Sequence, residues 1–248
     1  MGKNKVVIFA GGTGQRMKYQ IPKQFIKFRG VPILISTILK FEKHPLIDEI
    51  YVVIKEGYEE YTKEQIRHFN IKKVVEVTKP YSSKSGMDSI YTGLDLASRN
   101  MEDDDIVLIH DGVRPIISED LITRNIETCK EKGNAISCAN MSETPVIIND
   151  EGEIIEVIER SKCKRAKAPQ TFFLKDILAA HNKVREEIGN YDMFIDNCNL
   201  MTYLGNKCHF VESSTSNIKI TTQDDIYKMI GVLNAEDYKE FFEGTKHE

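Results

Sequence analysis

The sequence lacks the features that define several classes of protein. Its five cysteines include no C-x-x-C pair and are odd in number, so we expect free thiols and no disulfide or zinc framework. No apolar run approaches the ~20 residues of a membrane span, and the run Val6–Ala10 meets glycines at once. We therefore expect a cytoplasmic protein without membrane contact.

An excess of positive charge is also absent. The chain of 248 residues has 34 Lys and Arg against 38 Asp and Glu, a net charge of −4, so no nucleic-acid partner is expected. No internal repeat or low-complexity linker divides it, and 41% of its residues are hydrophobic. We expect a single domain over residues 1–248.

Short apolar runs alternate with segments of helical spacing through the first half of the chain. The predicted strands are Val6–Ala10, Ile50–Ile54, Lys73–Val77 and Ile106–Ile109, and the predicted helices are Ile33–Phe41, Tyr58–His68, Ser89–Ser98 and Glu119–Lys132. This alternation predicts an α/β fold with a doubly wound, mostly parallel sheet. Ligands of such sheets lie beyond the carboxyl ends of the strands.

The second half of the chain contains a hairpin pattern. After a strand-like run at Ala135–Ala139, two β-rich runs, Pro145–Ile148 and Glu153–Ile158, flank the turn Asn149–Gly152. A hairpin is poorly stable alone, so we predict a β-arm at about 138–165 that packs on another surface, such as a second subunit. Two helices, at Lys175–Glu187 and Asp224–Asn234, and a short strand at Lys207–Val211 are expected to follow.

A glycine loop follows the first predicted strand. It reads Gly11-Gly12-Thr13-Gly14-Gln15-Arg16-Met17, and Pro22-Lys23-Gln24-Phe25 comes next. Glycines at this place let backbone N–H groups surround a phosphate, although a tight turn with solvated charges is the plainer alternative. The loop is neither a Walker A loop nor G-x-G-x-x-G, which disfavours NAD. Arg16 and Lys23 add two cations suited to a triphosphate.

These segments resemble the signature of the polyol-phosphate cytidylyltransferases, which include the ribitol 5-phosphate and 2-C-methyl-D-erythritol 4-phosphate enzymes. The resemblance continues in the same order at His110–Pro115, Ala168–Phe172 and Ser216–Thr222. It implies a Rossmann-like nucleotidyltransferase fold, a CTP:polyol-phosphate cytidylyltransferase activity and Mg²⁺ as cofactor. It also implies a homodimer whose β-arm completes the partner's active site.

The resemblance assigns residues to three roles. Catalytic contacts with the triphosphate are implied for Arg16, Lys23 and Lys219. Nucleotide contacts are implied for Ala10, Gly11, Gly12, Thr13, Gly14, Asp88, Ser89 and Asp111, of which Asp111 also faces Mg²⁺. Contacts with the polyol phosphate are implied for Arg114, Thr144, Arg160 and Asp196.

Plainer interpretations exist for several of these residues. Asp111 suits a turn before Gly112, and Asp88 suits a helix N-cap. Lys219 is compatible with a strand edge. Arg114 and Arg160 are compatible with intersubunit ion pairs.

Three positions depart from the family's pattern. Gly86 stands where an arginine is usual, and Ala168 and Ile195 stand where threonines are usual around the polyol. Two lost hydroxyls disfavour methylerythritol phosphate, and Val113 and Ser216-Asn217 are closer to the ribitol branch. We predict ribitol 5-phosphate first, a glycerol phosphate next and methylerythritol phosphate third. The first two products would feed teichoic-acid or capsule-type polymers, and the third would feed isoprenoid synthesis.

Two functions of other kinds remain open. One is a sugar-1-phosphate nucleotidyltransferase that uses UTP or GTP, which Gln24 disfavours. The other is a scaffold without activity. The presence of Arg16, Lys23, Asp111 and Lys219 together disfavours it.

Overall fold

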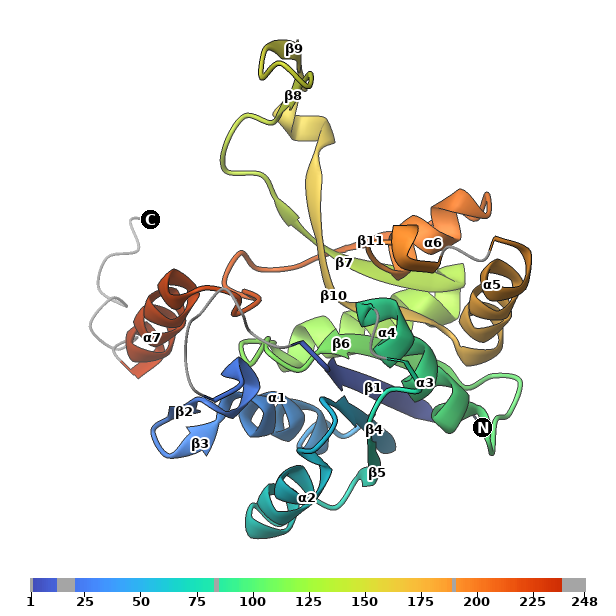
Figure 1. Cartoon of the computed structure of the whole chain (residues 1–248), viewed down its shortest axis with the longest axis vertical. Coiled ribbons are helices and arrows are strands. Elements are labelled where there is room, and N and C mark those ends of the chain that lie inside the picture. The colour runs from blue at the N-terminus through green and yellow to red at the C-terminus, as the bar shows by residue number, and fades with distance from the viewer. Residues whose placement is uncertain (1, 13–20, 83–84, 189–190, 238–248) are drawn as a thin grey trace, which may run out of the picture.

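A computed structural model describes residues 2–12, 21–82, 85–188 and 191–237 (Figure 1). Its main sheet has seven strands in the order β11-β7-β10-β6-β1-β4-β5. In chain order these strands are β1 (Asn4–Ala10), β4 (Glu49–Ile54), β5 (Val74–Thr78), β6 (Ile106–Asp111), β7 (Asn134–Asn140), β10 (Lys164–Phe173) and β11 (Phe210–Glu212). All neighbours in the sheet are parallel except β10, which is antiparallel to both β6 and β7. The predicted mostly parallel α/β sheet is confirmed.

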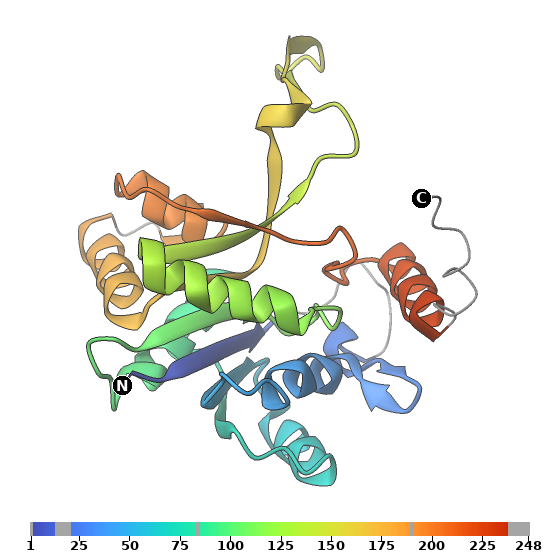
Figure 2. The same ribbon diagram turned by 180° about the vertical axis from the view of Figure 1, so that it is seen from behind.

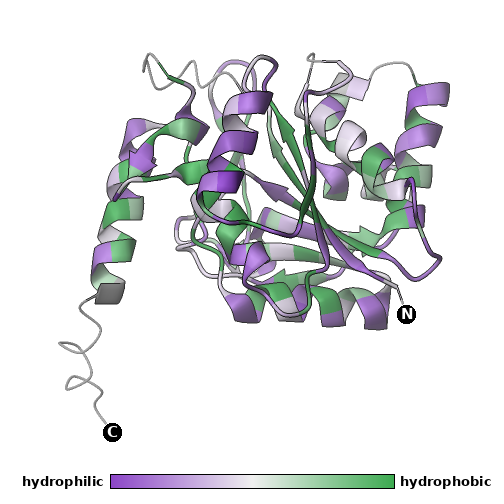
Figure 3. Cartoon of the chain, turned by 90° about the horizontal axis from the view of Figure 1, so that it is seen from below, coloured by the Kyte–Doolittle hydropathy of each residue, from purple (hydrophilic) through white to green (hydrophobic). Residues whose placement is uncertain are grey.

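Helices cover both faces of the sheet (Figures 1 and 2). Their bounds are α1 (Ile33–Glu42), α2 (Glu59–His68), α3 (Gly86–Ser98), α4 (Glu119–Lys132), α5 (Leu174–Glu187), α6 (Asn197–Tyr203) and α7 (Gln223–Asp237). Alternate residues of β1 point to opposite faces: Ile8 packs with α1, α2 and α4, and Val7 packs with α3, α5 and α6. Apolar segments accordingly lie between sheet and helices, with polar segments outside (Figure 3).

A third apolar cluster fixes the last helix. Met229 of α7 and Ile220 pack against Ile33 and Val113. Two short strands, β2 (Lys27–Phe28) and β3 (Val31–Pro32), form a small hairpin before α1. The chain segment around Ile220 is thereby held beside the carboxyl end of β6.

The central strands end next to each other at one edge of the sheet. The register pairs Phe9 of β1 with Asp111 of β6, and Ala10 is the last residue of β1. Gly112 follows Asp111 and is closely packed. A Cβ at this position would lie 2.8 Å from the Ala10 Cβ and 2.9 Å from the Leu34 Cδ1. This edge therefore brings the start of the glycine loop beside Asp111.

The predicted hairpin is present as β8 (Val146–Ile148) and β9 (Ile154–Val157), which pair antiparallel. Together with the extended ends of β7 and β10 it projects away from the sheet (Figure 1). Its apolar side chains are exposed, among them Ile148 at 59% and Val157 at 65%. Such exposure in a thin projection is typical of a surface that another chain covers.

The sequence misplaced three parts of the sheet. Strand β10 was not predicted, because its first half is basic and Pro169 interrupts the pattern. The strand expected at Lys207–Val211 lies at Phe210–Glu212, and β6 continues past Ile109 through Asp111. Helix α6 was also missed, since seven residues are too few for a clear helical period.

Candidate active site

The start of the glycine loop packs directly against α3. A Cβ on Gly11 would lie 2.8 Å from the Ser89 Oγ, so a larger residue there would displace the Ser89 hydroxyl. Gln24, 1% exposed, donates from Nε2 to the carbonyl of Ala10 at 2.9 Å and to that of Gly12 at 3.4 Å. The structure thus brings the predicted residues Ala10, Gly11, Gly12 and Ser89 together.

Three further predicted residues belong to the rest of the loop. Thr13, Gly14 and Arg16 lie outside the described residues. Lys23 begins a short 3-10 helix (Lys23–Phe25) directly before Gln24. The amide of Gln24 therefore connects the segment of Lys23 with the end of β1.

Asp88 has a structural role at the start of α3. Its carboxylate accepts from the Ser85 N–H at 3.1 Å, and the Ser85 hydroxyl accepts from the Asp88 N–H at 3.4 Å, which forms a capping box. Arg185 of α5 lies 3.3 Å from the other carboxylate oxygen and over the rings of Tyr91 and Tyr191. The N-cap of α3 is thus Ser85, and Asp88 serves as the N3 residue of the capping box instead of the N-cap expected from the sequence. Ser89 is the residue that meets the loop.

Sequence reasoning missed Arg185. It comes from a helix far along the chain, and its two tyrosine neighbours lie on different elements. No local motif surrounds it, so only the fold identifies it. It anchors the first turn of α3 from the side of α5.

Asp111 is the centre of a buried charge cluster. Its Oδ2 lies 2.7 Å from the Arg114 Nε, and its Oδ1 lies 2.5 Å from the Lys219 Nζ. Burial alone would raise the pKa of Asp111, but the positive charges of Lys219 and Arg114 outweigh it and hold that pKa well below its usual range. The carboxylate is ionised, and it holds two cations at the edge of the sheet where the glycine loop begins.

The two cations differ in exposure. The Arg114 side chain is 10% exposed, and its Nη1 also donates to the carbonyl of Asn217 at 3.0 Å. The Lys219 side chain is 43% exposed and also lies over the ring of Phe9, 6.0 Å from its centroid. Arg114 is thus fixed on two sides, whereas Lys219 presents its ammonium to solvent and to an incoming anion.

The cluster carries one negative charge against two positive ones. Such a surplus, preorganised at a buried carboxylate, suits the binding of phosphate groups. Among the described residues, no group of three or more His, Cys, Asp or Glu side chains is placed to hold a metal ion. A Mg²⁺ ion at Asp111 would accordingly take its remaining oxygen ligands from phosphates and water, as Mg²⁺ commonly does.

The neighbouring histidine has no place in this charge cluster. His110 is fully buried, its Nε2 lies 3.2 Å from the Arg114 carbonyl, and its ring contacts Phe41 edge-on. Burial lowers the pKa of His110 to about 4. The ring is neutral at physiological pH and supports the turn of Arg114.

The residues predicted for the polyol phosphate lie in three places, one of which is the Asp111 cluster with Arg114. Asp196 caps α6 through the Asn199 N–H at 2.8 Å and accepts from the Gln170 amide at 2.9 Å. Thr144 and Arg160 lie on the arm, where Arg160 donates to the Ser142 carbonyl at 3.2 Å. Within one chain, the structure does not bring Thr144 and Arg160 to the Asp111 cluster.

Residues 5–234 match the model of the family described as IspD, 2-C-methyl-D-erythritol 4-phosphate cytidylyltransferase. The chain belongs to this cytidylyltransferase family. The enzyme is thus a nucleotidyltransferase, as the glycine loop and the later motifs predicted.

Two curated relatives illustrate the range of the family. A ribitol-5-phosphate cytidylyltransferase of Vibrio parahaemolyticus is 38% identical over 240 residues, which cover 96% of this chain and 99% of the relative. A 2-C-methyl-D-erythritol 4-phosphate cytidylyltransferase of Clostridium botulinum is 36% identical and covers 91% of this chain and 95% of the relative.

A solved structure agrees with the fold. The 4-diphosphocytidyl-2C-methyl-D-erythritol synthase of Anaerococcus prevotii superposes with a TM-score of 0.79 at 26% identity, over 94% of this chain and 96% of that one. Within the described part of the cytidylyltransferase, no helix has the length and hydropathy needed to span a membrane.

Proposed function

We propose that this cytidylyltransferase joins CTP to ribitol 5-phosphate and releases pyrophosphate, with a glycerol phosphate as the second-ranked substrate. The observation that carries the proposal is the pair of cations on Asp111, beside the contact of Gly11 with Ser89. Relatives named ribitol-5-phosphate cytidylyltransferase are 35–39% identical to this chain, four of them at 38–39%, and relatives named for methylerythritol phosphate are 33–36% identical. The preference for ribitol rests on these names and on Ala168 and Ile195.

The reaction is an in-line displacement. A phosphate oxygen of the polyol phosphate attacks the α-phosphorus of CTP, the new P–O bond forms, and the bond to pyrophosphate breaks. A phosphate monoester is already an anionic nucleophile, so positioning and charge neutralisation carry the catalysis. Lys219, Lys23 and Arg16 neutralise the triphosphate, and the Gly11–Gly14 loop supplies backbone N–H groups.

Arg114 has a different task. Its guanidinium lies against Asp111 and the Asn217 carbonyl, and its position beside Lys219 suits the phosphate of the second substrate. Mg²⁺, held in part by Asp111, supplies further charge neutralisation at the phosphates when it is bound. Asp196, which accepts from the Gln170 amide, is assigned to the polyol hydroxyls.

The polyol site is completed by a second chain. Arg160 and Thr144 lie on an arm whose apolar side chains are exposed in one chain, including Ile154 at 62% and Ile155 at 63%. An isolated hairpin with such a face is poorly stable, which favours a homodimer in which each arm packs on the other subunit. The domain is then one unit with an exchanged β-arm at about 138–165.

Substrate choice is tested by pyrophosphate release with CTP and Mg²⁺. Ribitol 5-phosphate, glycerol 2- and 3-phosphates and methylerythritol 4-phosphate are compared in parallel. We expect the largest kcat/KM with ribitol 5-phosphate. A larger value with methylerythritol phosphate would refute the ribitol assignment, and turnover only after CTP is replaced by UTP or GTP would refute the choice of nucleotide.

Arm exchange is tested by complementation between two inactive variants. One variant carries Lys219→Met and the other carries Arg160→Ala. If Arg160 acts across the interface, one active site of a mixed dimer carries both changes and the other site carries neither. Co-expression in equal amounts should then restore about a quarter of the wild-type activity. No recovery in purified mixed dimers would show that Arg160 and Lys219 act within one chain.

A further inference from the structure

Lys167 makes an unusual set of contacts for a strand lysine. It lies on β10, where the pairing with β7 shifts register between Ala166 and Gln170. Its Nζ donates to the carbonyls of Ser214 and Thr215, both at 3.1 Å, and to that of Asn217 at 2.9 Å. A lysine ammonium has three N–H donors, so these three carbonyls use all of them.

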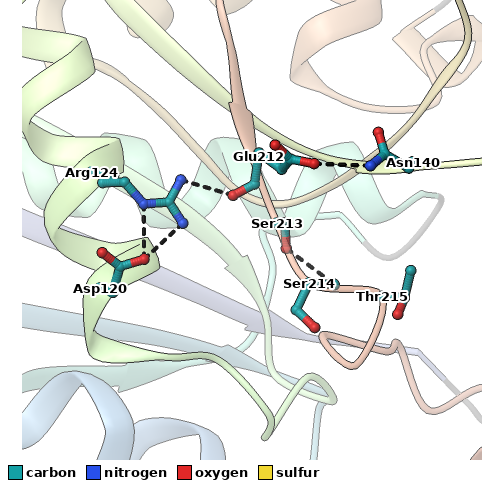
Figure 4. A pocket seen from close by; sticks show the side chains of 7 residues that line it. All are labelled: Asp120, Arg124, Asn140, Glu212, Ser213, Ser214 and Thr215. Atoms are coloured by element: carbon teal, nitrogen blue, oxygen red, sulfur yellow. Dashed lines mark hydrogen bonds and ion pairs between the residues drawn. The ribbon is translucent and has the colours of Figure 1, made fainter. Parts of the chain in front are cut away.

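The carbonyls belong to one loop, Ser213–Asn217, which links β11 to Lys219. Upstream of the loop, Arg124 of α4 donates to the Glu212 carbonyl at 2.8 Å. Figure 4 shows Arg124, Glu212 and the loop residues Ser213–Thr215 around one pocket. Arg124 therefore fixes the start of the loop from the side of α4.

Asn217 fixes the end of the loop on β10. Its Nδ2 donates to the Ala168 carbonyl at 2.7 Å, and the residue is only 2% exposed. Lys167 and Ala168 thus bind the loop through adjacent residues of one strand. The loop between these anchors contains hydroxyl residues, and Lys167 supplies the donors for its inward carbonyls.

The contacts of Lys167 lead directly to the active-site cations. The Asn217 carbonyl that accepts from Lys167 also accepts from the Arg114 Nη1. Arg114 binds Asp111, which pairs with Lys219 two residues beyond Asn217. A shift of the loop would therefore move the Lys219 ammonium and one anchor of Arg114 together.

We propose that Lys167 is a positioning residue that holds the Ser213–Asn217 loop and thereby places Lys219 and Arg114 for the reacting phosphates. Lys167 touches no reacting atom in this assignment. The inference rests on the proposed function, because that function gives Lys219 and Arg114 their roles.

The charge on Lys167 is sensitive to pH. Burial, together with the positive charges of Arg114 and Arg165, lowers the pKa of Lys167 to about 8. The loop presents only carbonyl oxygens to the Lys167 ammonium. The nearby carboxylate of Asp111 is paired with Arg114 and Lys219 instead. Above about pH 8 the free enzyme loses one donor and the charge that orders the carbonyls, so the loop is less well held.

The test compares Lys167→Met with Lys167→Arg and with the control Lys175→Met. Lys175 lies on α5, and its side chain is 44% exposed and 3.8 Å from Asp103. We expect Lys167→Met to lower kcat/KM about tenfold or more at pH 7.5, and Lys175→Met to leave it unchanged. The wild-type kcat/KM, which reports the free enzyme, should decline above about pH 8. Lys167→Arg keeps its charge and should lose this decline.

A second readout does not depend on turnover. Hydrogen exchange of peptides covering 212–219 should be faster in Lys167→Met than in the wild type, and unchanged in Lys175→Met. If Lys167→Met had the same kcat/KM and the same hydrogen exchange as the wild type, the inference would be overturned. If Lys167→Met does not fold, an unaltered alkaline decline in Lys167→Arg would overturn it as well.

The proposed function and this inference fail in different ways. A wild-type enzyme that is inactive with CTP and every polyol phosphate would refute the function, while the exchange experiment would still test the loop. If the wild type is active and Lys167→Met changes neither kcat/KM nor hydrogen exchange, only the positioning role is refuted.

Discussion

The neighbouring strands β1 and β6 have a charged cluster at each of their ends. At the amino end, the Lys5 Nζ lies 2.7 Å from the Asp105 Oδ2, and both side chains are 1% exposed. At the carboxyl end, Asp111 is shared by Arg114 and Lys219, and the Lys219 side chain is 43% exposed. The same residue types thus form a closed pair at one end and an open cluster at the other.

The closed pair is saturated by its surroundings. Lys5 also donates to the carbonyls of Ala97 and Asn100, and Asp105 also accepts from the N–H groups of Lys3 and Glu102. The open cluster has one more positive charge than negative and a cation facing solvent. Burial, saturation and charge balance therefore distinguish a closed structural pair from an open cluster that we propose binds anions.

The largest expected effect is on stability at the closed end. Lys5→Met leaves the Asp105 carboxylate buried without its cation, which should cost about 3–5 kcal/mol in the free energy of unfolding. Equilibrium denaturation in urea measures the loss. Folded Lys5→Met at low temperature should keep the wild-type KM for CTP, because the site lies at the other end of the sheet. A loss much smaller than this range would show that the pair contributes little.

The next effect is on catalysis at the open end. If Lys219 acts on the triphosphate as proposed, Lys219→Met removes a cation from the transition state for cytidylyl transfer, and kcat should fall by about 10²–10³-fold. The unfolding midpoint should change little, since the lysine is half exposed. Lys175→Met is the matched control: that side chain is 44% exposed and lies 3.8 Å from Asp103, away from this cluster. Equal losses of kcat in the two variants would contradict the distinction between the ends.

The residues of the open cluster were easier to single out from the sequence than those of the closed pair. Gly11, Asp111 and Lys219 belong to local motifs at strand ends, so pattern and resemblance identified them. Lys5 looks like a surface lysine before an apolar run, and its partner Asp105 lies 100 residues away in one of several acidic positions. Only the register of β1 against β6 brings the two together.

Lys167 and β10 escaped prediction for a related reason. The strand is antiparallel, begins with basic residues and contains Pro169, so neither periodicity nor composition indicated it. The contacts of Lys167 with three carbonyls depend on a loop about 50 residues further along the chain. Local patterns carry no information about such contacts.

A smaller effect is expected just beyond the open cluster, at Asp225 in the first turn of α7. Thr221 and Thr222 each donate to its Oδ2 through the N–H and the hydroxyl, at 2.8–2.9 Å. Burial opposes ionisation, but these bonds outweigh it and lower the pKa of Asp225 to about 2 from 3.8.

This carboxylate stabilises the fold fully above the unfolded pKa, and the contribution disappears as the pH falls from about 4 to about 2. Asp225→Asn should therefore lower stability by about 2 kcal/mol at pH 7 and reduce the loss on acidification. Denaturation midpoints of both proteins between pH 7 and pH 3 measure this. Parallel curves with a constant offset would show that the ionised form of Asp225 is not what stabilises the turn.

The smallest effect is expected at Lys3, two residues before Lys5. Lys3 pairs with Glu49, but its side chain is 51% exposed. The hydrogen bond and the charge of Glu49 raise the pKa of Lys3, yet water already solvates this ammonium, so the pair adds little to stability. Lys3→Met should leave the denaturation midpoint within error of the wild type, in the same experiment in which Lys5→Met shifts it strongly. Because both substitutions remove one lysine from the amino end of β1, their difference isolates burial as the cause, and similar shifts would contradict that assignment.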